Sequence, residues 1–270
     1  MFAIIIKNVK PTEAGDGMHT KNEYIAVFDS GVGGISVLRE LVKLMPRERY
    51  LYFGDSANAP YGSKTTEQVR ALTLDAARML MDRGVKALVV ACNTATSAAI
   101  TLLREQYPDT IVIGIEPALK VAADRFPKGR IGVMATQVTL REEKLAHQLE
   151  RFPEARVELI PAPGLVEQIE AGQVQTEETE QLIRHILEPY QGRLDALVLG
   201  CTHYPFARDV IGRILGEQTV LLDGGQGTAR QARRCLEAEG LLGDGPGCVL
   251  LESSSPDPGL TELAKTLLYG

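Results

Sequence analysis

The feature that most constrains this chain is the regular alternation of short apolar runs with amphipathic stretches from Tyr24 onward. Such alternation is typical of βαβ units that build a parallel sheet. The stretch 66–83 shows the helical type, because its apolar residues recur near the 3.6-residue period. The runs that we expect to be strands are 25–28, 50–53, 87–91 and 111–115 in the first half, and 131–134, 157–160, 196–199 and 220–222 in the second.

The two halves of the chain also resemble each other. The run 87–92 (ALVVAC) resembles 196–201 (ALVLGC) at an offset of 109 positions, and 25–27 (IAV) resembles 131–133 (IGV) at an offset of 106. Chance similarity between buried strands is the alternative, but the near-equal offsets and the shared strand order favour an internal duplication. We therefore predict an α/β fold with two pseudo-symmetric lobes, each a mostly parallel four-stranded sheet flanked by helices, and an active site in the cleft between them.

The lobes can be assigned to segments of the chain. Residues 1–23 are expected to form a tail, because proline and glycine interrupt any regular element there, and Met18 could be a second start site. The first lobe is expected to comprise 24–117 together with 228–270, which could return as a helical strip to pack on it. The second lobe is expected to comprise 118–227.

Composition and charge argue against several classes of function. The net charge is −6 and the Lys and Arg residues are dispersed, which gives no support to nucleic-acid or membrane-surface binding. The apolar run 1–6 is too short for a signal peptide or a spanning helix, so we expect a cytoplasmic protein. The four cysteines, Cys92, Cys201, Cys235 and Cys248, match no disulfide framework or zinc spacing. We therefore expect free thiols and no metal site.

Each half places one cysteine at the carboxyl end of its third expected strand. Ligands bind at that edge of open parallel sheets, and the polar residues after Cys92 and Cys201 could cap a helix. A thiol at a helix N-terminus has its pKa lowered from about 8.5 toward neutral. Two thiols facing one cleft could remove a proton from one face of a carbon and deliver one to the other, which inverts a stereocentre.

The alternative is that both thiols are buried structural cysteines. We expect that role for Cys235 and Cys248, because Cys235 lies in an amphipathic helical pattern and Cys248 in a short apolar run. Matched positions in repeated halves, with polar neighbours, favour a catalytic role for the other pair.

Polar loops follow the first two expected strands. Asp29 and Ser30 precede the glycine-rich turn 31–34, where a ligand carboxylate could meet free N–H groups of the next helix, or Asp29 could simply cap a tight turn. The sequence 60–62 (PYG) indicates a rigid loop with a tyrosine at its tip, which could close over a substrate or be an ordinary surface turn.

A histidine and a glutamate could assist the second thiol. His203 lies two positions after Cys201 and could hold its proton or stabilise its anion. Glu170 could orient His203, although spacing alone favours a solvated helix carboxylate. The Cys–His pair could also mark a nucleophilic hydrolase, which leaves Cys92 unexplained. A non-catalytic amino-acid-binding protein would account for two lobes and a cleft, but not for thiols from both sides.

Four blocks in order resemble the glutamate racemases of the aspartate/glutamate racemase family: 25–34 (IAVFDSGVGG), 60–62 (PYG), 91–96 (ACNTAT) and 199–205 (LGCTHYP). The resemblance spans about 24–229. It implies a racemase that interconverts L- and D-glutamate without organic cofactor or metal and supplies D-glutamate for peptidoglycan synthesis. It also implies a homodimer. A racemase of aspartate is the nearest rival, because it would differ only in pocket length.

The resemblance also implies residue roles. Cys92 would take the α-proton from D-glutamate with help from Asp29, and Cys201 would take it from L-glutamate with help from His203 and Glu170. The implied substrate contacts are Asp29, Ser30, Pro60, Tyr61, Gly62, Asn93, Thr94, Thr139, Thr202 and His203.

Overall fold

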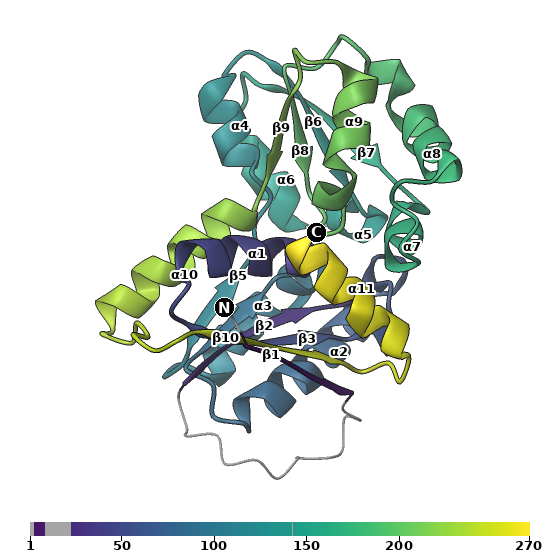
Figure 1. Cartoon of the computed structure of the whole chain (residues 1–270). Helices are drawn as coiled ribbons and strands as arrows, with labels where there is room; N and C mark the ends of the chain where they lie inside the picture. Colours follow the sequence, from purple (N-terminus) through teal and green to yellow (C-terminus); the bar gives the residue numbers. More distant parts are fainter. Residues whose placement is uncertain (1–2, 9–22, 142) are drawn as a thin grey trace.

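The computed structural model describes residues 3–8, 23–141 and 143–270 and contains two all-parallel sheets, one in each of two lobes (Figure 1). The first sheet has the order β1-β10-β3-β2-β4-β5, and the second has the order β7-β6-β8-β9. The strands are β1 (Ala3–Asn8), β2 (Tyr24–Asp29), β3 (Arg49–Gly54), β4 (Ala87–Val90), β5 (Ile111–Gly114), β6 (Arg130–Ala135), β7 (Arg156–Pro161), β8 (Ala196–Leu199), β9 (Val220–Asp223) and β10 (Cys248–Ser253). The predicted fold class, two lobes with parallel sheets, is confirmed.

Helices cover both faces of each sheet. The α-helices are α1 (Ile35–Leu44), α2 (Thr66–Met81), α3 (Asn93–Gln106), α4 (Leu119–Arg125), α5 (Gln137–Arg141), α6 (Glu143–Glu150), α7 (Leu165–Glu170), α8 (Glu177–Leu187), α9 (Arg208–Leu215), α10 (Gly225–Ala238) and α11 (Pro258–Tyr269). The 3-10 turns are η1 (Ser56–Asn58), η2 (Tyr61–Ser63), η3 (Glu188–Tyr190) and η4 (Tyr204–Ala207). None of the described helices is long and apolar enough to span a bilayer.

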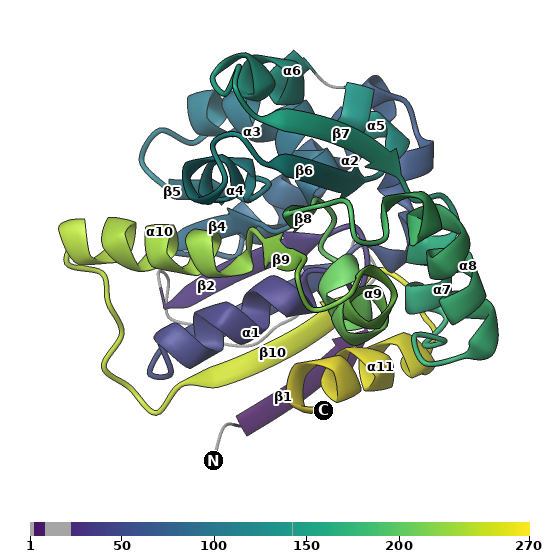
Figure 2. The same cartoon turned by 90° about the horizontal axis from the view of Figure 1, so that it is seen from above.

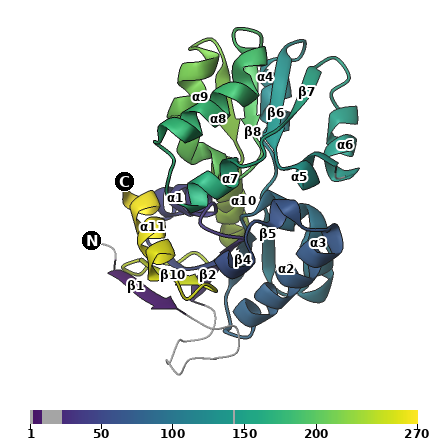
Figure 3. The same ribbon diagram turned by 90° about the vertical axis from the view of Figure 1, so that its right-hand side faces the viewer.

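Each sheet separates two apolar layers. In the first lobe, α1, α10 and α11 pack on one face and α2 and α3 on the other (Figure 3). In the second lobe, α7, α8 and α9 cover one face and α4, α5 and α6 the other. Helices α1 and α10 lie side by side over the first sheet (Figure 2). Because both faces of the sheets are covered, their central strands must be apolar on both sides.

Strand β2 shows how the sequence produces this arrangement. It lies between β3 and β4, and all six of its residues are buried. Ile25 and Val27 point toward the α1 side, whereas Ala26 and Phe28 point toward α2 and α3, as the two-residue period of a strand requires. The strand ends at Asp29, so this carboxylate lies at the carboxyl edge of the sheet, where ligands bind in parallel folds.

The two lobes share one strand order. All eight strands expected from the sequence are present, and in each lobe their order is second, first, third, fourth: β3-β2-β4-β5 and β7-β6-β8-β9. Cys92 follows β4 and Cys201 follows β8, so the two cysteines occupy equivalent places in the two sheets. The chain crosses between the lobes twice, from β5 to α4 and from β9 to α10.

The first sheet has two strands more than the predicted four. Segment 228–270 does return to the first lobe, but it contains β10 and is not a purely helical strip; β10 pairs with β3 and β1. The expected tail 1–23 is wrong for Ala3–Asn8, which form β1, and residues 9–22, with Met18, lie outside the described residues. Both strands are short apolar runs whose partners are distant in sequence, so periodicity along the chain does not indicate the pairing.

Candidate active site

The two equivalent cysteines approach each other from opposite lobes. Cys92 is 5% exposed and Cys201 is 8% exposed. They are close enough that negative charge on Cys201 raises the pKa of Cys92. The described cysteines are all free thiols. The structure therefore brings together the two sulfur atoms that sequence repetition singled out.

The pKa of Cys92 differs from the expectation for a helix N-terminus. Cys92 is the N-cap of α3, and its Sγ accepts the Ala95 N–H at 3.4 Å and lies 3.6 Å from Ser30 Oγ. Burial and, after it, the charge of Asp29 nevertheless raise the pKa of Cys92 to about 12, although these two contacts lower it. The expected lowering of this pKa is therefore wrong, and Cys92 holds its proton at neutral pH.

Asp29 links the two lobes from the end of β2. Its side chain is fully buried, Oδ1 accepts the Gly31 N–H at 3.0 Å, and Oδ2 accepts the Thr202 hydroxyl at 3.0 Å. Burial raises the pKa of Asp29, although the charge of His203 and these hydrogen bonds oppose the rise. The carboxyl group thus lies close to the charged groups of His203 and Glu170, both from the second lobe.

His203 lies between Cys201 and Glu170. Its Nδ1 is 3.5 Å from Cys201 Sγ, and its Nε2 is 2.5 Å from Glu170 Oε1. Burial alone would lower the pKa of His203, but the hydrogen bonds to Cys201 and Glu170 outweigh it, and the pKa lies well above its ordinary value. The Glu170 side chain is 15% exposed and also accepts the Val32 N–H at 2.7 Å. This carboxylate is therefore held between the lobes and is not a solvated helix residue.

The glycine-rich turn fits against these second-lobe side chains. A Cβ atom on Gly31 would lie 1.9 Å from Glu170 Oε1. A Cβ on Gly33 would lie 2.4 Å from His203 Nδ1 and 2.6 Å from Thr202 Oγ1. Glycine is required at both positions because the lobes approach each other closely here. We call the turn 31–34 the socket, because it receives the side chains of Glu170 and His203.

On the Cys92 side, threonine hydroxyls join the lobes. Thr94 Oγ1 lies 3.2 Å from Thr139 Oγ1 and 3.3 Å from Thr136 Oγ1. A Cβ on Gly62 would lie 2.7 Å from the Thr136 Cγ2 atom, so η2 also packs against this threonine. Sequence reasoning missed Thr136. Thr136 stands 106 positions after Ser30. This is the same offset that separates 25–27 from 131–133, so the repeat could have identified Thr136.

The loop 60–62 differs from its expected shape. Tyr61 is 1% exposed, packs near Phe28 with ring centroids 6.4 Å apart, and donates its hydroxyl to Asp55 Oδ2 at 2.7 Å. The tyrosine therefore anchors the loop in the core and does not stand at its tip. Pro60 and Gly62 flank the tyrosine. Sequence reasoning missed Asp55, although it directly follows β3 in the way that Asp29 ends β2.

Asn93 carries an unused acceptor beside the thiol. It is 5% exposed, and its Oδ1 is a buried side-chain atom without a hydrogen-bond partner among the described residues. Buried polar atoms are normally paired, so such an atom at a strand end needs an explanation. A donor such as a ligand ammonium group would satisfy it.

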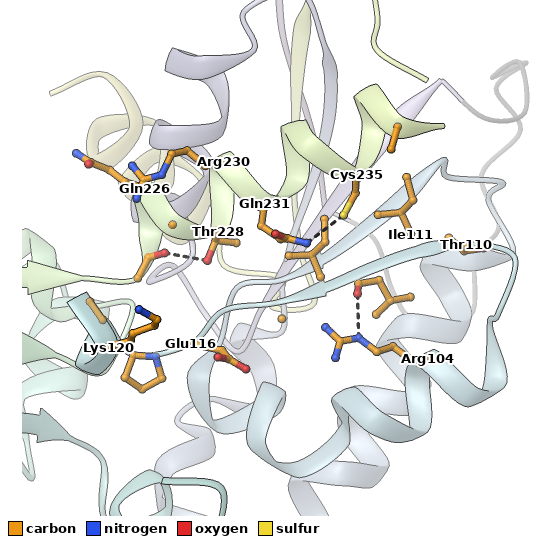
Figure 4. A pocket seen from close by; sticks show the side chains of 18 of the residues that line it. Arg104, Thr110, Ile111, Glu116, Lys120, Gln226, Thr228, Arg230, Gln231 and Cys235 are labelled. Carbon is orange, nitrogen blue, oxygen red and sulfur yellow. Dashed lines mark hydrogen bonds between the residues drawn. The ribbon is translucent and has the colours of Figure 1, made fainter. Parts of the chain in front are cut away.

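A cavity of about 1050 Å³ lies apart from the thiols, where β5, α4 and α10 meet (Figure 4). Both crossings between the lobes line it, and so do side chains of both charges, including Arg104, Glu116, Lys120 and Arg230. Neither Cys92 nor Cys201 lines this cavity. Within the described part of the chain, no group of three or more His, Cys, Asp or Glu side chains could hold a metal ion.

Comparisons with known proteins agree with this geometry. Residues 25–232 match the family model of the Asp/Glu/Hydantoin racemases. A glutamate racemase of Clostridium perfringens is 46% identical over 252 residues, which cover 92% of this chain and 97% of that protein. The structure of a glutamate racemase from Francisella tularensis in complex with D-glutamate is similar with a TM-score of 0.81 and 28% identity, covering 92% of this chain and 94% of that one.

A second solved structure gives the same result. The Escherichia coli glutamate racemase, in complex with L-glutamate, is similar with a TM-score of 0.80 and 32% identity, and the match covers 91% of this chain and 94% of that one. The family match covers residues 25–232, and the relative and the two solved structures cover 91–92% of the chain. The chain therefore belongs to the Asp/Glu/Hydantoin racemase family and is an isomerase.

Proposed function

We propose that this chain interconverts L-glutamate and D-glutamate by moving the α-proton between two thiols, Cys92 and Cys201. The observation that carries the proposal is the pair of buried sulfur atoms, one from each lobe, close enough that the charge of Cys201 raises the pKa of Cys92. Their surroundings differ in a useful way. Cys92 holds its proton beside Asp29, whereas Cys201 lies next to His203, whose pKa is raised.

The reaction needs no other group to carry the proton. From L-glutamate, Cys201 in its thiolate form takes the α-proton and becomes a thiol, and the electron pair of the broken C–H bond remains on the substrate as a carbanion. The thiol of Cys92 then gives its proton to the opposite face of the same carbon. In the reverse direction the two thiols exchange roles, and each proton transfer by a positioned group typically contributes roughly 10²–10⁴-fold in rate.

Polar groups around the thiols fit an amino acid. The unpaired Asn93 Oδ1 can accept a hydrogen bond from the α-ammonium group, and Asp29 supplies negative charge nearby. The Ser30 hydroxyl lies 3.6 Å from the sulfur of Cys92, and Thr94 and Thr202 add hydroxyls in the segments that follow the two cysteines. The Tyr61 hydroxyl already donates to Asp55, so we do not assign it a contact with the substrate.

The choice of glutamate rests on the relatives. Proteins similar over most of their length are glutamate racemases, and two of them were solved with D-glutamate and with L-glutamate. The same proposal includes a role in supplying D-glutamate for peptidoglycan synthesis, a homodimer and a cytoplasmic location.

One experiment tests the function. The protein is incubated with L-glutamate in D₂O without added cofactor, and the optical rotation and the α-proton signal are followed. We expect the rotation to decay to zero while deuterium enters the α-position. Rotation that decays with aspartate but not with glutamate would assign the rival substrate. Unchanged rotation with both amino acids would reject racemisation and leave hydrolysis or simple binding.

A further inference from the structure

A serine in the first lobe touches the loop that carries the second-lobe thiol. Ser36 lies in the first turn of α1 and is half-buried. Its Oγ donates toward two carbonyl oxygens, Thr202 O at 2.8 Å and Gly33 O at 2.9 Å. The first acceptor belongs to the second lobe and the second to the first lobe. Ser36 therefore contacts the backbone between Thr202 and His203.

The position of this contact matters for the thiol. The Thr202 carbonyl belongs to the peptide unit that joins Thr202 to His203, and this unit is planar. Holding the carbonyl therefore holds the point from which the His203 side chain leaves the backbone. That ring lies 3.5 Å from Cys201 Sγ and is fixed on its other side by Glu170. A displacement of this peptide would move the imidazole away from the sulfur.

The serine can make and break its bond across the cleft at little cost. A hydroxyl carries one proton, and here it has two acceptors. If the Thr202 carbonyl moves away, the Ser36 hydroxyl can still donate its proton to Gly33 O, so the donor is not left unpaired.

Two other hydrogen bonds cross between the lobes, and each of them involves a side chain of the second lobe. The Val32 N–H donates to Glu170, and the Thr202 hydroxyl donates to Asp29. Ser36 complements them because it holds the main chain of the loop. Side-chain contacts can follow a loop that shifts, whereas a bond to the main chain opposes the shift itself.

We propose that Ser36 is a positioning residue for Cys201, holding the Thr202–His203 peptide so that this thiol meets the α-carbon in the closed site. This inference rests on the proposed function, because it assumes that Cys201 exchanges a proton with the substrate. It predicts that the loss of Ser36 slows the proton transfer at Cys201 and not the transfer at Cys92.

Three variants isolate the hydroxyl. In Ser36→Ala, we expect kcat to fall about tenfold in both directions with less than a twofold change in KM, since one hydrogen bond is worth up to about 1.4 kcal/mol, or a factor of ten. Ser36→Thr keeps the hydroxyl and should recover most of the rate. Thr219→Val is the matched control, because the buried Thr219 hydroxyl donates to Leu194 O at 3.0 Å at the opposite, amino end of β9. It should leave the rate unchanged.

Isotope effects separate positioning from a general loss of structure. With α-deuterated L-glutamate, Cys201 removes the deuteron, so the substrate isotope effect of Ser36→Ala should exceed that of the unsubstituted chain. With α-deuterated D-glutamate, Cys92 removes the deuteron and Cys201 delivers a proton from solvent. The slowed step then does not involve deuterium, so the substrate isotope effect of Ser36→Ala should equal that of the unsubstituted chain or be smaller. A partly unfolded sample would lower the rate and change neither isotope effect.

The outcomes are distinct for the two proposals. An isotope effect that rises only from L-glutamate supports the role of Ser36. Unchanged effects, or equal rises in both directions, in a chain that does racemise glutamate would overturn the role of Ser36 and leave the proposed function intact. If the unsubstituted chain fails to racemise glutamate, both the proposed function and the role of Ser36 are overturned.

Discussion

The hydroxyl of Thr202 in the second lobe donates to the Asp29 carboxylate of the first lobe across 3.0 Å. The same carboxylate raises the pKa of Cys92 through its charge. Asp29 therefore contacts the loop of one thiol while it holds the proton on the other. Because the two residues are 173 positions apart, this coupling exists only when the lobes meet.

Replacement of Asp29 should change the titration of Cys92. In Asp29→Asn the negative charge is lost, so the pKa of Cys92 should fall below its value of about 12. The rate of Cys92 alkylation by iodoacetamide would be followed against pH by mass spectrometry, in a Cys201→Ser background that removes the second thiol. We expect the alkylation of Cys92 in Asp29→Asn to reach its plateau at lower pH than with Asp29 present. Identical profiles would mean that Asp29 does not hold this proton.

Each thiol should be essential. Cys92→Ser and Cys201→Ser should each lower kcat by roughly 10²–10⁴-fold, because a serine hydroxyl is a far weaker base than a thiolate. Racemisation is measured by polarimetry and folding by circular dichroism. Cys235→Ser is the control, since Cys235 lies on α10 and its sulfur contacts Gln231. A folded Cys92 variant with more than a tenth of the native rate would contradict the two-thiol mechanism, whichever substrate is used.

A single methyl group in the glycine turn should block closure. In Gly31→Ala the new Cβ would lie 1.9 Å from Glu170 Oε1, so the carboxylate must leave both Val32 and His203. We expect kcat/KM to fall by roughly 10²-fold, measured with either enantiomer, because the groups around the second thiol are displaced. Gly227→Ala is the matched control, because the position is helical and, among the described residues, no atom outside its own helix turn lies within 4 Å of a Cβ there. Equal rates for the two variants would show that the socket is not needed.

The pair of His203 and Glu170 should stabilise the fold in a pH-dependent way. The pKa of folded His203 is raised, so its contribution is complete below the unfolded value of about 6.5 and is lost as pH rises through the folded value. His203→Asn should therefore lower the free energy of unfolding by roughly 3 kcal/mol near pH 6, where it breaks a buried ion pair. The difference from the native chain should shrink at alkaline pH.

Urea unfolding at several pH values measures this difference. Glu170→Gln removes the partner of His203, so its loss in the free energy of unfolding should also shrink at alkaline pH. The coupling energy between the two substitutions, measured with the double variant, should approach zero over the same pH range. A difference between His203→Asn and the native chain that grows with pH would contradict the raised pKa of His203.

Much of the architecture could be predicted from local patterns. The eight expected strands, the repeat and the equivalent positions of Cys92 and Cys201 all followed from apolar runs and their offsets. Strand β10 could not be predicted in this way, because it joins the sheet beside β3 through contacts distant in the chain. The position of Tyr61 was also mistaken, because its burial depends on Asp55 and Phe28 rather than on its own loop.

The amino-acid sequence by itself determined the fold class, the two lobes and which cysteines lie at the ends of equivalent strands, because these follow from periodicity and repetition along the chain. Only the tertiary structure decided the charges within the site. The pKa of Cys92 is raised rather than lowered because burial and Asp29 outweigh the helix N-terminus. Burial and the approach of charges from another lobe are properties of three-dimensional packing, and the local sequence contains no record of them.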